Sequence, residues 1–203
     1  MRRLLAWEGT DGWRAELAEV ELRAEGVRAR GVQLGVDPQP YRLDYRLDAL
    51  DSFRTRRLEA QVSIDGRRRE LDLRRDQDDG WSWRLASDGD ELGSSAADAA
   101  QLEGALDCDL ALSPLTNLMP VRREGLAHPH QGLDLVCAWI AVPELTVSPY
   151  PQRYEHVRRR GDGAATVRFV DRGPSEGFVA ELELDPDGLI VVYPDLARRV
   201  GPS

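Results

Sequence analysis

The residues between positions 107 and 123 form the densest set of side chains able to bind a ligand. Arginine guanidinium groups bind phosphates, carboxylates and sugar hydroxyls, and asparagine pairs with amides and hydroxyls through two hydrogen bonds. The same residue types can also hold a loop rigid through Arg–Asp pairs, and residue type alone favours that structural role. The polar members of this segment are Asp107, Asp109, Thr116, Asn117, Arg122 and Arg123.

Two of these residues could form a pair of catalytic carboxylates. Asp107 and Asp109 would share one face of a strand, about 7 Å apart by strand rise, which is within the range of glycoside hydrolase pairs. Such pairs usually face each other across a cleft from separate elements, whereas these two residues flank Cys108. A hydrolase that uses Asp107 and Asp109 is therefore an alternative interpretation. Both residues could equally pair with Arg122 and Arg123.

Other catalytic and metal-binding patterns are weaker. His128-Pro129-His130 and Asp134 place three potential metal ligands within seven residues, but no second cluster would complete a tetrahedral site. We interpret this segment as an exposed loop. The sequence contains no G-x-S-x-G, Walker, G-x-G-x-x-G or H-E-x-x-H motif, so it predicts no catalytic residue, no metal and no cofactor.

The composition of the chain argues against nucleic-acid-binding and helical membrane proteins. The chain has 203 residues with 36 acidic residues, 27 basic residues that are all arginine, and a net charge of −9. This balance opposes nucleic-acid binding, which depends on an excess of basic side chains. No apolar run approaches the roughly 20 residues that a transmembrane helix needs, and Glu8 interrupts the start before a secretory signal peptide could form. Cys108 and Cys137 lie outside any CxxC motif, so we expect buried thiols in a cytoplasmic protein.

Most segments that would position these residues show the alternation of apolar and polar side chains that is typical of β-strands. It is clearest at 56–86, where apolar residues recur at every second position and Asp65-Gly66 supplies a hairpin turn. This segment predicts a three-stranded antiparallel meander. Further strands are predicted at 13–22, 26–36, 41–48, 106–112, 132–141, 164–171, 177–184 and 189–193.

Helices are expected to be few and short. Ala and Gln favour a helical turn at 95–103, and Asp195 could cap a short helix over 196–200. Three prolines predict that 113–130 is largely loop.

The predicted strands lead to a fold class. A sheet of antiparallel hairpins with one apolar face must bury that face, either by closing into a barrel, by stacking on another layer or by wrapping around other residues. We therefore predict that residues 1–203 form a single, mainly β domain with a curved, half-barrel-like antiparallel sheet and one or two short helices. Its concave apolar face could hold a hydrophobic ligand, although the same pattern also describes a filled core.

A series of motifs runs in order from residue 7 to residue 199, and the long central motif is the most specific. The residues of these motifs are Trp7-Glu8, Asp79-Gly80-Trp81, then Asp107, Asp109, Leu110, Pro114, Thr116, Asn117, Pro120, Arg122 and Arg123, then Gln152 and Tyr154, and finally Gly188-Leu189 with Tyr193-Pro194. Through these residues the chain resembles the putative glycolipid-binding family of bacterial proteins. The resemblance implies a curved antiparallel sheet with a groove for an amphipathic ligand.

Three functions remain open. The first is a non-enzymatic protein that binds a lipid-like or glycolipid-like molecule, with its acyl part on the concave face and its head group at Asn117, Arg122 and Arg123. The second is the hydrolase described above. The third is a scaffold domain whose groove is filled by aromatic side chains such as Trp83 and Trp139. The residues predicted to bind the ligand are Asp107, Asp109, Thr116, Asn117, Arg122, Arg123, Trp81 and Tyr154. The oligomeric state is left open.

Overall fold

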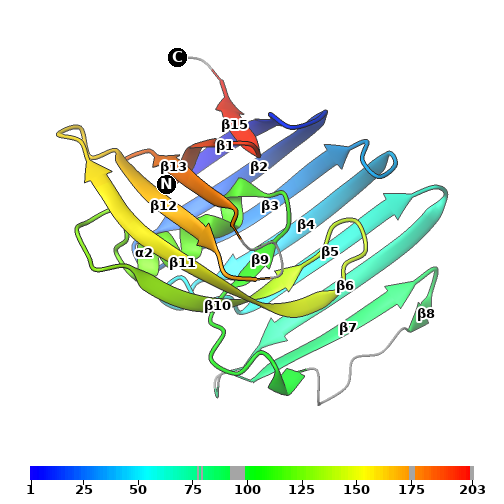
Figure 1. Cartoon of the computed structure of the whole chain (residues 1–203). Helices are drawn as coiled ribbons and strands as arrows, with labels where there is room; N and C mark the ends of the chain where they lie inside the picture. Colours follow the sequence, from blue (N-terminus) through cyan, green and yellow to red (C-terminus); the bar gives the residue numbers. More distant parts are fainter. Residues whose placement is uncertain (77, 79, 92–98, 174–176, 202–203) are drawn as a thin grey trace.

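The computed structural model describes residues 1–76, 78, 80–91, 99–173 and 177–201. In this described part, fifteen strands form one sheet in the order β8-β7-β6-β5-β4-β3-β2-β1-β15-β14-β13-β12-β11-β10-β9. The sheet curves without closing, and Figure 1 shows its two halves folded towards each other. The predicted fold class, mainly β with a curved half-barrel-like sheet, is confirmed.

The N-terminal half is a meander of consecutive antiparallel strands, which we call the N-terminal limb. Its residues alternate between buried apolar and exposed polar, as in β4, where every second residue from Tyr41 onwards is buried. The predicted meander over 56–86 is confirmed as β5, β6 and β7. The strands are β1 (Arg2–Gly9), β2 (Arg14–Arg23), β3 (Gly26–Gly35), β4 (Tyr41–Ala49), β5 (Arg57–Ile64), β6 (Arg67–Arg75), β7 (Trp81–Ser87) and β8 (Asp90–Glu91).

The hairpin between β5 and β6 shows why the turn residues fix this register. Asp65 and Gly66 both have positive φ angles, of 49° and 72°. Two residues of this kind make a turn whose twist matches that of the flanking strands. The predicted Asp65-Gly66 hairpin therefore sets the pairing of Ile64 with Arg67.

The remaining strands form the C-terminal limb. It joins the N-terminal limb where β15 pairs antiparallel with β1, so that Ala6 lies opposite Val200. The parallel pairing of β9 with β10 is the exception in this otherwise antiparallel limb. The strands are β9 (Cys108–Leu110), β10 (Leu133–Ile140), β11 (Val147–Arg159), β12 (Ala165–Asp171), β13 (Val179–Leu184), β14 (Ile190–Tyr193) and β15 (Ala197–Val200).

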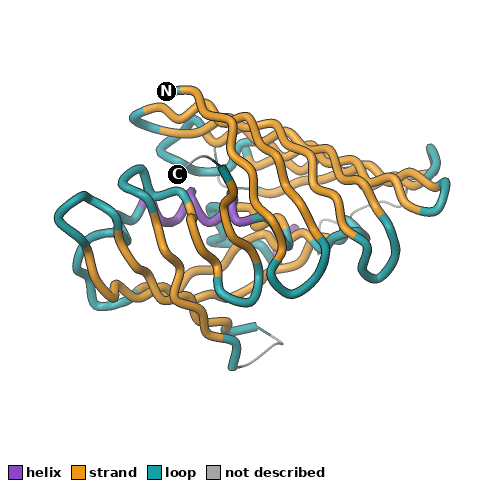
Figure 2. The backbone as a smooth tube through the Cα atoms, turned by 90° about the horizontal axis from the view of Figure 1, so that it is seen from above, coloured by secondary structure: helices purple, strands orange, loops and turns teal. Residues whose placement is uncertain are grey.

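A short helical segment lies between the two limbs, as Figure 2 shows. It consists of a 3-10 helix η1 (Pro114–Asn117) followed by α2 (Leu118–Arg123). Leu115, Leu118 and Met119 belong to the core that the N-terminal limb lines, whereas Val121 packs with the core of the C-terminal limb. The helical segment therefore fills much of the concave apolar face. No helix in the described residues is long and apolar enough to cross a membrane.

The prediction that 113–130 is largely loop is wrong for residues 114–123. Pro114 occupies the first position of η1, and Pro120 lies in the first turn of α2. Backbone N–H groups at the start of a helix have no intrahelical partner, so proline costs nothing there.

Two other sequence predictions also differ from the structure. The helix expected over 196–200 is the strand β15, because residues 197–200 pair with β1. The 13-residue strand β11 was not predicted, since Pro149 and Pro151 interrupt its pattern. Of the helical turn expected at 95–103, residues 95–98 lie outside the described residues, and residues 99–103 turn helically, with the Leu102 N–H donating to the Ala99 carbonyl at 3.1 Å. Asp79 of the Asp79-Gly80-Trp81 motif also lies outside the described residues. Cys108 and Cys137 are buried free thiols, as expected.

Candidate functional site

The central motif begins at an aspartate held by neutral partners. The carboxylate of Asp109 accepts hydrogen bonds from Thr116 Oγ1 at 2.8 Å and from Gln152 Nε2 at 2.6 Å. Burial removes water from this carboxylate and raises its pKa above the ordinary value. Thr116 and Gln152 therefore hold Asp109 in place without neutralising its charge.

Asp107, two residues earlier, has an ionic partner instead. A guanidinium N–H of Arg123 donates to its carboxylate, and both side chains are more than nine-tenths buried. The other face of the same guanidinium donates from Nε to Glu124 at 2.6 Å. Arg123 is thus fully engaged inside the protein.

Asn117 and Tyr154 complete this group of polar side chains. Asn117 Nδ2 donates to the Tyr154 hydroxyl at 3.0 Å, and that hydroxyl donates to Gln152 Oε1 at 3.3 Å. Tyr154 is completely buried and meets Phe169 edge to face, with ring centroids 5.4 Å apart. We call the group the aspartate cluster; its members are Asp107, Asp109, Thr116, Asn117, Gln152 and Tyr154.

The aspartate cluster surrounds very little space. The cavity that its six residues line, together with Cys108, Pro120 and their neighbours, has a volume of about 10 Å³. Such a volume holds about one water molecule and no sugar ring. The unpartnered Oδ1 of Asn117 is buried beside this cavity.

Trp81 lies apart from the aspartate cluster. It is buried in the core of the N-terminal limb, where its indole Nε1 donates to the carbonyl of Ala105 at 2.9 Å. The structure therefore brings five of the eight predicted ligand-binding residues into the aspartate cluster. Trp81, Arg122 and Arg123 are not members of it.

Arg122 lines a separate and open pocket of about 320 Å³, which we call the head pocket. Its guanidinium carbon lies 5.3 Å from the centre of the Phe53 ring, a cation–π contact. Its one hydrogen bond to the described residues runs from Nη1 to the Asp187 carbonyl at 3.5 Å and is long. The pocket is lined by Ala24, Glu25, Ser52, Phe53, Val121, Arg122, Arg123, Gly125, Ala127, His128, Arg159, Gly163, Pro186 and Gly188.

Sequence reasoning missed Arg159, whose exposed guanidinium joins the half-buried Arg122 in the wall of the head pocket. Arg159 ends β11, directly before the turn at Gly161-Asp162-Gly163 that leads into β12. The run Arg158-Arg159-Arg160 before a glycine turn was the pattern that could have identified it. With Arg122, Arg159 and Glu25, the wall of the pocket carries more positive than negative charge.

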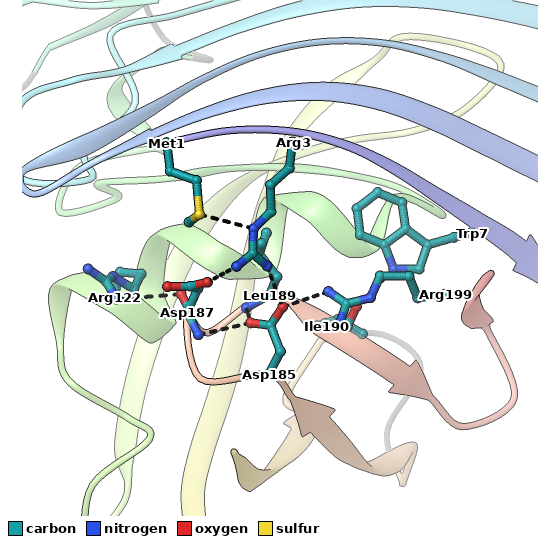
Figure 3. Close-up of polar contacts among 9 residues, drawn as sticks. All are labelled: Met1, Arg3, Trp7, Arg122, Asp185, Asp187, Leu189, Ile190 and Arg199. Carbon is teal, nitrogen blue, oxygen red and sulfur yellow. Dashed lines mark hydrogen bonds and ion pairs between the residues drawn. The ribbon is translucent and has the colours of Figure 1, made fainter. Parts of the chain in front are cut away.

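An ionic network holds the turn that forms one wall of the head pocket (Figure 3). Asp185 Oδ1 accepts from the backbone N–H groups of Asp187 and Leu189, each at 3.0 Å. Its Oδ2 accepts from Arg199 at 2.7 Å and from Arg3 at 3.0 Å. The network fixes the 185–189 turn against the end of α2.

Gly188, in this turn, allows the close approach to Arg122. Its φ angle is +83°, and a Cβ atom there would lie 3.3 Å from Arg122 Cδ and 3.2 Å from Val121 Cγ1. Both the backbone conformation and the space favour glycine. The Gly188-Leu189 motif therefore shapes the head pocket next to the central motif.

The histidine segment provides no metal site among the described residues. Asp134 pairs with Arg153 at 2.6 Å, and His130 Nδ1 accepts from the Gly132 N–H at 2.9 Å. His128 is exposed in the wall of the head pocket. These side chains thus point to different partners.

Comparisons with known proteins identify the family. A family model described as "Putative glycolipid-binding" matches residues 4–199. The chain belongs to this family. Among solved structures, a DUF1089 family protein from Pseudomonas aeruginosa has a TM-score of 0.71 and 26% sequence identity, over 91% of this chain and 92% of that chain. The search of curated proteins found no match. The family resemblance inferred from the motifs is confirmed.

Proposed function

We propose that this protein binds an amphipathic, glycolipid-like molecule without changing it chemically, and that the head pocket receives the polar head. The observation that supports this most strongly is Arg122, a residue of the family motif whose guanidinium lines an open pocket of about 320 Å³. Pockets of this size suit small ligands. Arg122 and Arg159 would bind hydroxyl, carboxylate or phosphate oxygens.

The head pocket also offers apolar surface beside its charges. Phe53 and Val121 are buried side chains of its wall, and Ala24 and Ala127 are its smaller apolar members. A ligand with a polar head and an apolar stem would contact both kinds of surface. The two buried free cysteines fit a reducing compartment such as the cytoplasm.

The contacts of the two aspartates favour binding over hydrolysis. Asp107 is paired with Arg123, and Asp109 is held by Thr116 and Gln152 beside a cavity of about 10 Å³. A pair of catalytic carboxylates needs a substrate between its two members. The hydrolase alternative therefore gains no support from this geometry.

The test is native mass spectrometry after incubation with a lipid extract of the host. Wild type should carry a stoichiometric amphiphile, and Arg122→Ala should bind it about tenfold less tightly, because charge-assisted hydrogen bonds are lost. Arg160→Ala is the matched control, since Arg160 is an arginine next to Arg159 of the head pocket but does not line the pocket itself. No adduct on wild type, or equal losses in both variants, would contradict the proposal and favour a scaffold.

A further inference from the structure

The outer face of the N-terminal limb, opposite the helical segment, carries a long groove. Its volume is about 1110 Å³, and it crosses β1 to β7. Nine arginines and five acidic residues line it, in a chain whose net charge is −9. With the adjoining hollow that Leu17 lines, the face carries eleven arginines and eight acidic residues, so its charge is positive although that of the whole chain is negative.

Arg46, like Arg56, is a cation of this groove that forms no ion pair with the described residues. It lies directly opposite Arg30 in the pairing of β3 with β4, an arrangement of like charges that destabilises a sheet unless an anion compensates it. Arg30 pairs with Glu19 at 2.6 Å, whereas Arg46 has no side-chain partner in the described part of the chain. The acidic residues beside Arg46 already pair with other arginines: Asp44 with Arg42, Asp48 with Arg28, and Glu59 with Arg57.

Exposed apolar side chains continue the groove across β1, β2 and β3. Leu4 and Leu17 are 65% and 49% exposed, and both line the groove region. Leu34, on the same face of β3, is 37% exposed. Trp13 and Val36, 62% and 46% exposed, lie where β2 and β3 meet at Arg14 and Gly35. A contiguous exposed strip of this kind is unusual on a soluble protein and marks an interaction site.

We propose that this outer face docks on an anionic lipid surface. The arginines of the groove would contact head-group phosphates, and Arg46 would bind first because it has no ion pair to break among the described residues. The strip of Leu4, Leu17 and Leu34 would enter the boundary between head groups and acyl chains, and Trp13 suits that depth. The excess of arginine on this face favours an anionic lipid surface over the same face of a second copy, because two like-charged faces repel each other.

This inference is independent of the head pocket, and it goes beyond ligand binding. It describes how the protein reaches the membrane where amphiphiles reside, through residues that the family motif does not include. The two sites share no lining residue. Arg122→Ala should therefore leave docking unchanged.

Co-sedimentation with vesicles tests the proposal. The full chain should bind vesicles that contain phosphatidylglycerol at least about tenfold more tightly than vesicles of phosphatidylcholine alone. Arg46→Ala should weaken that binding about fivefold, the value of one basic residue near such a surface. Arg168→Ala removes the same charge from the C-terminal limb and should have no effect. Leu17→Ser should weaken binding while the net charge stays constant.

Three results would overturn the proposal. One is equal binding to both kinds of vesicle, and another is an unchanged affinity in Arg46→Ala. The third is a concentration-dependent dimer in the absence of lipid that Leu17→Ser converts to monomer, which would assign the strip to a second copy. Circular dichroism of each variant confirms that these exposed substitutions leave the fold intact.

Discussion

Arg122 and Arg123 are neighbours at the end of α2, yet they lie in opposite surroundings. Arg123 turns into the aspartate cluster, where Asp107 and Glu124 occupy its guanidinium. Arg122 turns towards the head pocket, where it rests on Phe53 and has one long hydrogen bond. The difference shows that a single polar motif can divide into a part that builds the fold and a part that faces a ligand.

The aspartate cluster gains its rigidity from the way it is assembled. Asp107 directly precedes β9, and the other members lie in β9, η1 and β11, so the hydrogen bonds of Asp109 and Asn117 tie the helical segment to the C-terminal limb. The walls of the head pocket likewise come from distant parts of the chain, but Arg122 and Arg159 there form no ion pair with the described residues. Substitutions in the two regions should therefore affect different properties.

The largest expected effect is that of Arg123→Ala. It would leave the buried Asp107 carboxylate without its counter-ion, and breaking a buried pair by removing one partner costs about 3–5 kcal/mol of unfolding free energy. Urea denaturation followed by circular dichroism measures this loss. Arg122→Ala should lower the free energy of unfolding by about 1 kcal/mol or less. If Arg123→Ala cost less than Arg122→Ala, the proposed difference between the two arginines would be wrong.

Glu16 is another buried polar residue, and its carboxyl group should make the free energy of unfolding depend on pH. Its Oε1 accepts from Tyr45 at 2.5 Å and from Ser113, which precedes η1, at 2.7 Å. Burial raises the pKa of Glu16 from 4.5 to about 7. The folded state therefore binds the proton more tightly than the unfolded state does. Stability should fall by about 3 kcal/mol as pH rises from about 4.5 to about 7.

The matched variant for this effect is Glu16→Gln, which keeps the shape of the side chain and cannot titrate. Chemical denaturation at a series of pH values should show a slope for wild type that is flatter in the variant over this interval. Asp109 also has a raised pKa and contributes in the same direction, so the difference between the two proteins is the relevant quantity. Identical slopes would show that Glu16 titrates normally.

Tyr154→Phe should have a smaller effect of about 1 kcal/mol. The substitution removes the hydroxyl that accepts from Asn117 and donates to Gln152, but it keeps the packing against Phe169. Thermal unfolding measures the loss. The same variant should retain the amphiphile adduct at wild-type occupancy, and a lost adduct in a stable variant would move the ligand site into the aspartate cluster.

The sequence predicted the structure best where the structure depends on neighbouring residues. Alternation along β4 and β5 and the Asp65-Gly66 turn predicted the N-terminal meander, because strand faces and hairpin turns depend on neighbouring residues. The C-terminal limb depends on pairing between distant segments. Residues 197–200 look helical in isolation and become a strand only because β1 lies beside them.

The candidate site follows the same rule. Polarity and spacing identified the motif residues, but not that Asp109 and Asn117 would turn inwards while Arg122 faces a pocket. That division depends on where α2 lies between the limbs, which no local pattern encodes. Arg159 joins Arg122 from a segment more than thirty residues away, so only the folded chain brings the two together.

Photo-crosslinking tests the central claim most directly. An alkyl glucoside with a diazirine on its sugar would be irradiated with the full chain, and the modified peptides would be mapped by mass spectrometry. We predict adducts at Ser52 and Phe53 and in the segment 121–128, which line the head pocket, with strong reduction in Arg122→Ala. Adducts concentrated at Cys137, Gln152 or Tyr154 would place the ligand in the aspartate cluster and contradict the account.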